Sequence, residues 1–257
     1  MVGAMTIILD DETTWPTDVL AYLEHKHDLF LAWEHRGTDR ESYVVGPSDY
    51  DNAIYGLRAV LNGYLLRGYH CTRLTESEMQ NIMLNGMQLP NDVILRDRIR
   101  SVQNAGLIDP RIAERLIIEN QAGESNRAKI IWFCFFPPHI AGQEGIERFF
   151  RSWGGEALYN SHERDPITGP ILRSIGTPCI IEADLPIANL KAHSFLDEKV
   201  IRRFLTRRGY ETTECVDLED SATSAILSQN IRRIICHSDP DFITLTGCNN
   251  WSPPLTS

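Results

Sequence analysis

The sequence predicts an α+β fold, with a mostly antiparallel core decorated by helices, and three observations support this class. Apolar spacings typical of helices and of strands are intermixed along the 257 residues, without the regular βαβ alternation of a doubly wound sheet. No glycine-rich phosphate-binding loop follows a strand-like run. Apolar residues make up 42% of the chain, which is enough for the core of one large domain or of two small ones.

The first quarter of the chain is expected to be helical. Apolar side chains recur at helical spacing in both 17–35 and 48–66. Each segment begins with residues that can cap a helix, namely Thr17 or Asp18 in the first and Ser48 or Asp49 in the second. We therefore expect a helical N-terminal region at 1–66 packed on the core, the core itself at 67–248, and a tail at 249–257.

A short strand and three helices should follow. The segment "GYHCTRL" (68–74) starts at a glycine and has the length of a strand. Thr75 can then cap a helix, and Glu78 three residues later completes a capping box. Two further helices are expected at 91–106 and 109–123, because each segment begins with Asn or Asp and finishes at Ala-Gly.

The second half of the chain continues the mixture. Its expected elements are a strand at 129–136, a helical stretch at 145–159 interrupted by Gly154-Gly155, a strand at 176–186, a helix at 195–209, and a strand, tight turn and strand at 224–238. The run "IIWFCFF" is the most apolar of these, and Pro137-Pro138 ends it well short of a membrane span.

Composition narrows the functional classes. The six cysteines are far apart, without a C-x-x-C pair, and the eight histidines form no H-E-x-x-H motif, so we expect reduced thiols, a cytoplasmic protein and no metal. The net charge of −10 argues against a protein that coats nucleic acid. Basic residues do gather at 199–209 and 230–235, which indicates solvated helix faces or a local site for a phosphate-bearing partner.

The strand "YHCT" carries an unusual set of polar side chains. Alternation along a strand places His70 and Thr72 on one face, and Tyr69, Cys71 and Arg73 on the other. A histidine and a hydroxyl on one face can hold a ribose diol or an amide. The alternative is a half-buried histidine that a neighbouring hydroxyl satisfies.

Two other groups of residues could carry chemistry. The segment "SWGGEALY" (152–159) combines Trp153, paired glycines, Glu156 and Tyr159, which suits a planar polar ligand, whereas the alternative is a helix that ends, turns and restarts. Carboxylates that could hold a ribose hydroxyl or stabilise a cationic sugar are Glu182, Glu214, Glu219 and Asp220.

Taken in order, these segments resemble the ADP-ribosyltransferase superfamily, of the type with His-x-Thr in the first core strand that occurs in toxin and defence proteins. The resemblance spans about 67–238 and rests on "YHCTRLTESEMQNIMLNGMQLP", "IIWFCFF…WGGEALY", "PCIIEADLP" and "LSQNIRRII". It implies a split, mostly antiparallel β core. The glutamate that the family places just before the last of these segments is missing, because this chain reads "SATSA" there.

The resemblance also implies roles for single residues. His70 would bind the nicotinamide ribose of NAD, Thr72 or the adjacent backbone would hold the carboxamide, and Tyr159 would stack on the nicotinamide ring. Arg67 and Arg73 would contact the pyrophosphate. Glu219, or else Glu156, would supply the catalytic carboxylate.

The function implied is that of a cytoplasmic NAD-dependent ADP-ribosyltransferase, with NAD as a substrate and no metal. Its acceptor would be a protein or a nucleic acid, and an antitoxin or regulatory protein could be a further partner if the enzyme is a toxin or phage-defence effector. Two alternatives remain open, an NAD glycohydrolase that uses the same site and a non-catalytic binding or immunity-type module. The geometric expectation is that His70 and Tyr159 face one nicotinamide-sized hollow.

Overall fold

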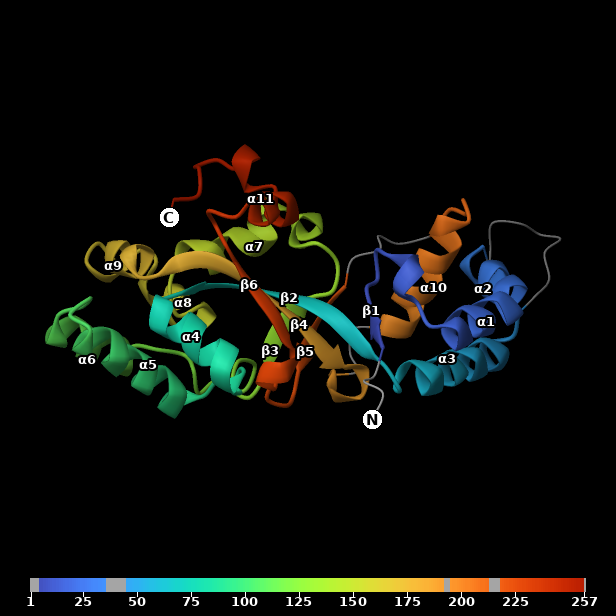
Figure 1. The fold of residues 1–257 in the computed structure, drawn as a ribbon, viewed down its shortest axis with the longest axis horizontal. Coiled ribbons are helices and arrows are strands. Elements are labelled where there is room, and N and C mark those ends of the chain that lie inside the picture. The colour runs from blue at the N-terminus through green and yellow to red at the C-terminus, as the bar shows by residue number, and fades with distance from the viewer. Residues whose placement is uncertain (1–4, 36–44, 192–194, 213–217, 257) are drawn as a thin grey trace.

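The computed structural model describes residues 5–35, 45–191, 195–212 and 218–256. Within these residues the fold is α+β, as predicted, and the sheet is mostly antiparallel. The sheet lies in the middle of an elongated molecule with helices at both ends (Figure 1). Helices α1 to α3 and α10 form one end, and α5, α6, α8 and α9 form the other.

The elements of the described residues follow in chain order. The strands are β1 (Thr6–Ile7), β2 (Leu65–Leu74), β3 (Ile131–Cys134), β4 (Thr177–Pro186), β5 (Glu219–Ala222) and β6 (Ile231–Cys236). The α-helices are α1 (Thr17–His25), α2 (His27–Glu34), α3 (Pro47–Leu61), α4 (Glu76–Asn85), α5 (Asp92–Asn104), α6 (Pro110–Ile118), α7 (Gly142–Arg151), α8 (Glu156–His162), α9 (Thr168–Ser174), α10 (Leu196–Arg207) and α11 (Pro240–Thr246). Short 3-10 turns are η1 (Glu12–Thr14), η2 (Pro138–Ala141), η3 (Ile187–Asn189), η4 (Ser228–Asn230) and η5 (Cys248–Asn250).

The N-terminal helices form as expected but start and stop differently. The stretch 17–35 contains two helices, because the backbone leaves helical geometry at Lys26. Neither α1 nor α3 has a side-chain cap, so the predicted caps are wrong. The helix α3 instead begins with Pro47, whose fixed φ suits the first helical position.

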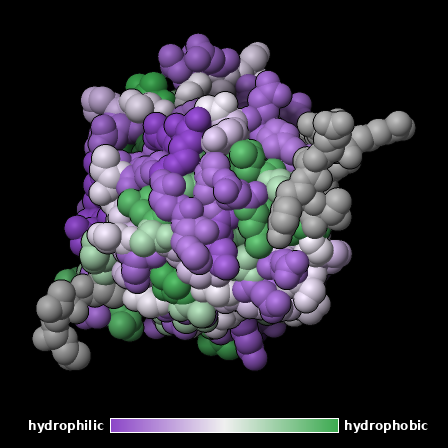
Figure 2. Space-filling model, turned by 90° about the vertical axis from the view of Figure 1, so that its right-hand side faces the viewer, coloured by the Kyte–Doolittle hydropathy of each residue, from purple (hydrophilic) through white to green (hydrophobic). Residues whose placement is uncertain are grey.

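This N-terminal region shares its core with the sheet. Leu23, Phe30 and Leu57 are fully buried in one cluster with sheet and α10 side chains. A buried ion pair, Arg202 Nε to Glu34 Oε1 at 3.0 Å, ties α10 to α2. Figure 2 views this end of the molecule, and the surface there is mostly hydrophilic with scattered hydrophobic patches.

The strand order is β5-β3-β2-β4-β6, and β1 pairs in parallel with the start of β2. Of the strand, tight turn and strand expected at 224–238, the second strand is confirmed as β6, but the first strand and the hairpin are wrong. The strands β5 and β6 lie at opposite edges of the sheet, since β5 pairs with β3 and β6 pairs with β4. A linking segment that includes η4 carries the chain between them, and only Ile226 bridges there, to Met87.

Local signals place several other boundaries correctly. Thr75 and Glu78 form the predicted capping box of α4, and Asn91 and Asp109 cap α5 and α6 with their side chains. Helix α7 ends before Gly154, where two successive glycines have positive φ, and α8 then begins at Glu156.

Helix α6 ends at Ile118, well short of the Ala-Gly expected to finish it, because Asn120 turns the chain by bonding to Ile117 O and Ala122 N.

The two faces of β2 belong to different cores. Leu66 and Leu74 join the large cluster that includes the N-terminal helices. Tyr69 and Cys71 join a second cluster, in which α7 and α11 cover the opposite face of the sheet. The last residues, expected as a tail, pack into this second cluster through Trp251 and Leu255.

Candidate functional site

Strand β2 is paired unevenly on its two sides. All ten residues of β2 have partners on β4. On the other side, β1 pairs with Leu65 and Leu66, and β3 pairs only at Tyr69, opposite Cys134. No described strand continues this ladder beyond Tyr69. We call residues 71–74, on this side, the open edge of β2.

The main chain of Cys71 points toward the open edge. Leu65 N–H donates to Met5 O at 3.0 Å on the side of β1, so odd-numbered residues of β2 direct their N–H and C=O groups to that side. Cys71 and Arg73 follow this alternation. Cys71, which is 8% exposed, therefore directs its peptide N–H and C=O to this edge beside His70, and these are the pair of groups that an amide ligand requires.

His70 lies where β3 leaves β2. Its Nδ1 is 2.8 Å from Trp132 O, and since a carbonyl can only accept, Nδ1 carries the proton. Burial lowers the pKa of His70, and the nearby positive charge of Arg98 lowers it further, although the bond to Trp132 opposes this. The half-buried imidazole is thus neutral at pH 7, with Nε2 left as an acceptor.

Thr72 shares the face of His70, as the sequence predicted. It is half-buried, and its hydroxyl has no hydrogen bond to another described residue. The same face carries Phe133, whose ring centroid is 5.6 Å from that of His70. Phe133 in turn pairs with the buried Asp220 on β5, so a carboxylate continues the row that starts at His70.

Glu78 organises the helices next to this face. Its Oε2 accepts from Thr75 N at 2.8 Å and from Trp153 Nε1 at 2.9 Å, and its Oε1 accepts from Arg98 Nε at 2.6 Å. Burial raises the pKa of Glu78, but Arg98 and these hydrogen bonds outweigh burial and leave the pKa below its usual value. Glu78 thereby joins α4, α5 and the segment before α8.

The side chain of Tyr159 does not lie near that of His70. It packs against α7, with its ring centroid 5.9 Å from that of Phe149 and 4.1 Å from the guanidinium carbon of Arg148. Helix α7 covers the Cys71 face of β2, whereas His70 is on the other face. The expectation that the two side chains share one hollow is therefore wrong.

Glu156 contacts Tyr159 rather than His70. It accepts a 3.3 Å hydrogen bond from Tyr159 Oη, and Arg127 Nε lies 3.5 Å from its other oxygen. Burial, followed by the charge of Glu156, raises the pKa of this tyrosine. Glu156 and Tyr159 thus form a cluster with α7 and Arg127 that does not include His70.

The two arginines assigned to a pyrophosphate are engaged elsewhere. Arg73 is 2% exposed, and it donates to Ile175 O at 2.7 Å, Phe150 O at 3.2 Å and Thr256 O at 3.3 Å. Arg67 forms ion pairs with Glu182 and Asp184 on β4. These contacts give both residues structural roles, and Arg98 is the arginine whose charge reaches His70.

Of the two candidate carboxylates Glu219 and Glu214, the structure describes only Glu219. Glu219 is exposed on β5, its Oε1 lies 3.8 Å from Cys134 Sγ, and its charge is among the causes that raise the pKa of Cys71. It therefore lies near β2, but on the face opposite His70. Glu214 falls outside the described residues.

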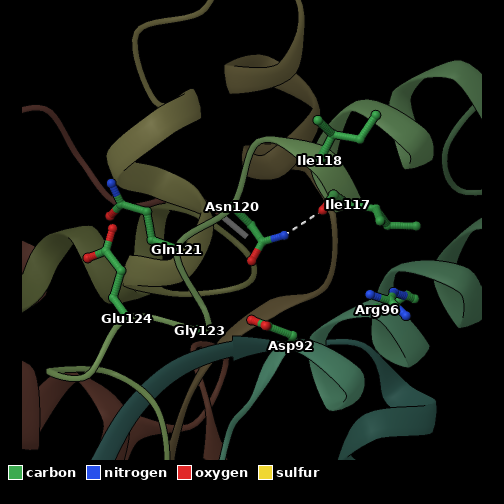
Figure 3. Close-up of a pocket in the computed structure, with 8 residues that line it drawn as sticks. All are labelled: Asp92, Arg96, Ile117, Ile118, Asn120, Gln121, Gly123 and Glu124. Carbon is green, nitrogen blue, oxygen red and sulfur yellow. Dashed lines mark hydrogen bonds between the residues drawn. The ribbon is translucent and has the colours of Figure 1, made fainter.

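A polar hollow of about 320 Å³ lies away from this region. Figure 3 shows Asp92 and Arg96 on α5 facing the end of α6 and the turn that carries Asn120 and Gly123. His70 and Thr72 do not line it.

Comparisons with known proteins found no match among family models, curated proteins or solved structures. Among the residues described here, no three His, Cys, Asp or Glu side chains are grouped as a metal site would require. None of the described helices has both the length and the apolar composition for crossing a bilayer.

Sequence reasoning missed Arg98 and the role of Glu78 beyond capping. The capping box signalled the local contacts of Glu78 with Thr75. Its bonds to Arg98 and Trp153 join residues 20 and 75 positions away, and no local pattern carries that information.

Proposed function

We propose that the chain is an NAD-consuming enzyme of the ADP-ribosyltransferase type, with its binding site at the open edge of β2. The observation that carries this proposal is the coincidence of a central strand edge, with which none of the described strands pairs beyond Tyr69, and a neutral, oriented imidazole next to it. A sheet that separates beside its histidine-bearing strand fits a split β core.

The available groups suit the nicotinamide riboside part of NAD. His70 Nε2 can accept a hydrogen bond from a ribose hydroxyl, because Nδ1–H is already used on Trp132 O. The Cys71 N–H and C=O can bind the carboxamide oxygen and amide hydrogen, and the Thr72 hydroxyl is available beside them. Arg98 is 31% exposed and supplies positive charge on the same side for a phosphate.

The chemistry is departure of nicotinamide from C1′ of the ribose, with the electrons of the C1′–N bond going to the pyridinium nitrogen. The cationic sugar then takes an acceptor nucleophile, which loses its proton. A carboxylate would stabilise that sugar by charge. Glu219 is the candidate that lies near β2, and Asp220 is the carboxylate on the face of His70.

Nicotinamide release from NAD tests this function. We expect release by the wild-type chain, a loss of at least tenfold in His70→Ala and Thr72→Ala, and wild-type rates in His25→Ala, whose histidine is exposed on α1. Tyr159→Phe should also keep the wild-type rate, because it removes only the hydroxyl contact with Glu156. Comparing Glu219→Gln with Asp220→Asn identifies the carboxylate, since only the catalytic one should retain NAD binding while losing release.

Measuring nicotinamide release with and without candidate acceptors distinguishes transfer from hydrolysis. Release that rises when protein or nucleic acid is added, with label from NAD recovered on it, supports transfer. Equal release with water alone indicates a glycohydrolase. No release and no NAD binding in any preparation would contradict the proposed function and leave a non-catalytic module.

A further inference from the structure

Two cysteines on adjacent strands face each other directly. Cys179 on β4 and Cys236 on β6 are Cα partners, and both thiols are free. The neighbouring bond from His237 N to Pro178 O, 2.9 Å long, makes Pro178 and His237 the hydrogen-bonded pair. Cys179 and Cys236 are therefore a non-hydrogen-bonded pair, in which side chains approach most closely.

This register satisfies the geometric requirement for a disulfide. The Cα atoms of non-hydrogen-bonded antiparallel pairs are about 4.5 Å apart. Disulfides span Cα separations of roughly 4.4–6.8 Å. The register therefore places Cys179 and Cys236 within the range of Cα separations that a disulfide spans.

A second pair of cysteines provides a contrast within the same sheet. Cys134 is opposite Tyr69, so Cys71 is its diagonal neighbour. The Cys134 thiol still comes close enough to hydrogen-bond, which is the largest cause raising the pKa of Cys71. Diagonal Cα separations are about 7–8 Å, however, beyond the range that a disulfide bridges.

The Cys179–Cys236 pair adjoins the candidate site. Thr72 is the partner of Cys179 on β2, so Thr72, Cys179 and Cys236 form one row across three strands. Cys236 Sγ lies 3.6 Å from Met79 Sδ on α4. Cys179 is fully buried, whereas Cys236 is half-buried and is the thiol that a small oxidant reaches first.

We propose that Cys179 and Cys236 are an oxidation site, at which a hydroperoxide converts the two thiols into a reversible disulfide. Cys236 sulfur attacks the peroxide, the O–O bond breaks, and a sulfenic acid and one water (or alcohol) form. Cys179 sulfur then attacks the sulfenic sulfur, the S–S bond forms, and a water leaves with the remaining proton. The two thiols give up two electrons, which reduce the peroxide.

The environment sets the speed of this reaction. Burial raises the pKa of Cys179 and of Cys236, so few thiolates are present at neutral pH. Because the thiolate is the reacting form, oxidation should be slow at pH 7 and should accelerate as the pH rises. Oxidation also removes the thiol hydrogen that Cys236 donates to Met79 Sδ, which couples the disulfide to a contact with α4.

Peptide mapping after oxidation tests the bond. The folded full chain is treated with hydrogen peroxide, its remaining thiols are blocked, and trypsin is added. Cys179 lies in the tryptic peptide 174–191, and Cys236 lies in 234–257 together with Cys248. A Cys248→Ser variant therefore makes the assignment unambiguous.

We expect a cross-link between these two peptides in the wild-type and Cys248→Ser proteins, its absence in Cys236→Ser, and its reversal by dithiothreitol. Persistence of the cross-link in Cys236→Ser would overturn the assignment. So would a peptide that joins Cys71 to Cys134, or thiols that all stay free at a peroxide dose that oxidises the same chain in urea.

A second measurement asks whether oxidation regulates the site, and it rests on the proposed function. NAD affinity should fall at least threefold on oxidation of the wild-type protein and stay constant in Cys236→Ser. A mapped disulfide with unchanged NAD affinity would overturn the regulation and leave the modification site. Failure of the reduced protein to bind NAD would instead contradict the proposed function, whatever the peptide map shows.

Discussion

Replacing Arg73 by methionine separates a structural role from a ligand-binding one. The three carbonyl oxygens that Arg73 contacts belong to Ile175, Phe150 and Thr256, which come from three distant parts of the chain. Methionine keeps an unbranched apolar stem but makes none of these bonds. At about 1 kcal/mol for each hydrogen bond, the free energy of unfolding should fall by about 3 kcal/mol.

Urea denaturation followed by circular dichroism measures this loss, and thermal melting should show a drop in Tm of roughly 6–12 °C for a chain of this size. Arg232→Met is the matched control, since its side chain is 56% exposed and its nearest carboxylate oxygen is 3.7 Å away. We expect the control to change stability by no more than about 0.5 kcal/mol. A loss below about 1 kcal/mol in Arg73→Met, or weaker NAD binding at unchanged stability, would refute the structural role.

Three further predictions concern ionisable groups. Because the pKa of Glu78 is lowered in the folded chain, its stabilisation should be lost as the pH falls below its ordinary value of 4.5, and Glu78→Gln should flatten acid denaturation in that range. Because the pKa values of His70 and His162 are lowered in the folded chain, the unfolded chain binds their protons first, and the free energy of unfolding should fall as the pH drops below 6.5. His70→Gln should reduce the dependence of this free energy on pH, as denaturation curves at several pH values will measure. Arg202→Met should cost about 3–5 kcal/mol by leaving Glu34 buried, and Arg202→Met combined with Glu34→Gln should cost less than the sum of the single changes, as a double-mutant cycle in urea will measure.

Local patterns were sufficient to predict most elements but not their partners. The capping residues Thr75, Asn91 and Asp109 mark helix starts through contacts within three residues, so the sequence carries them directly. The strands β5 and β6 are close in sequence, and a hairpin was the natural expectation. Their separation to opposite edges depends on pairing with β3 and β4, which is a long-range property.

The candidate site was predicted only in part, for the same reason. Alternation along β2 correctly placed His70 and Thr72 together, since side-chain direction in a strand depends only on the local period. The position of Tyr159 depends on how α7 and α8 pack, and this places it behind the sheet. Arg73 was expected to bind a pyrophosphate, because a strand pattern does not show that a side chain donates hydrogen bonds to carbonyl oxygens of distant segments.

Nitrogen-15 NMR of the histidine side chains during titration with NAD tests the central claim most directly. Before NAD is added, the His70 signals should report a neutral ring with the proton on Nδ1. Millimolar NAD should then shift the His70 Nε2 signal and leave His162 unchanged, because both nitrogens of that fully buried ring are already bonded to Thr168 and Glu119. A His70 spectrum that stays the same throughout the titration would contradict an NAD site at the open edge of β2.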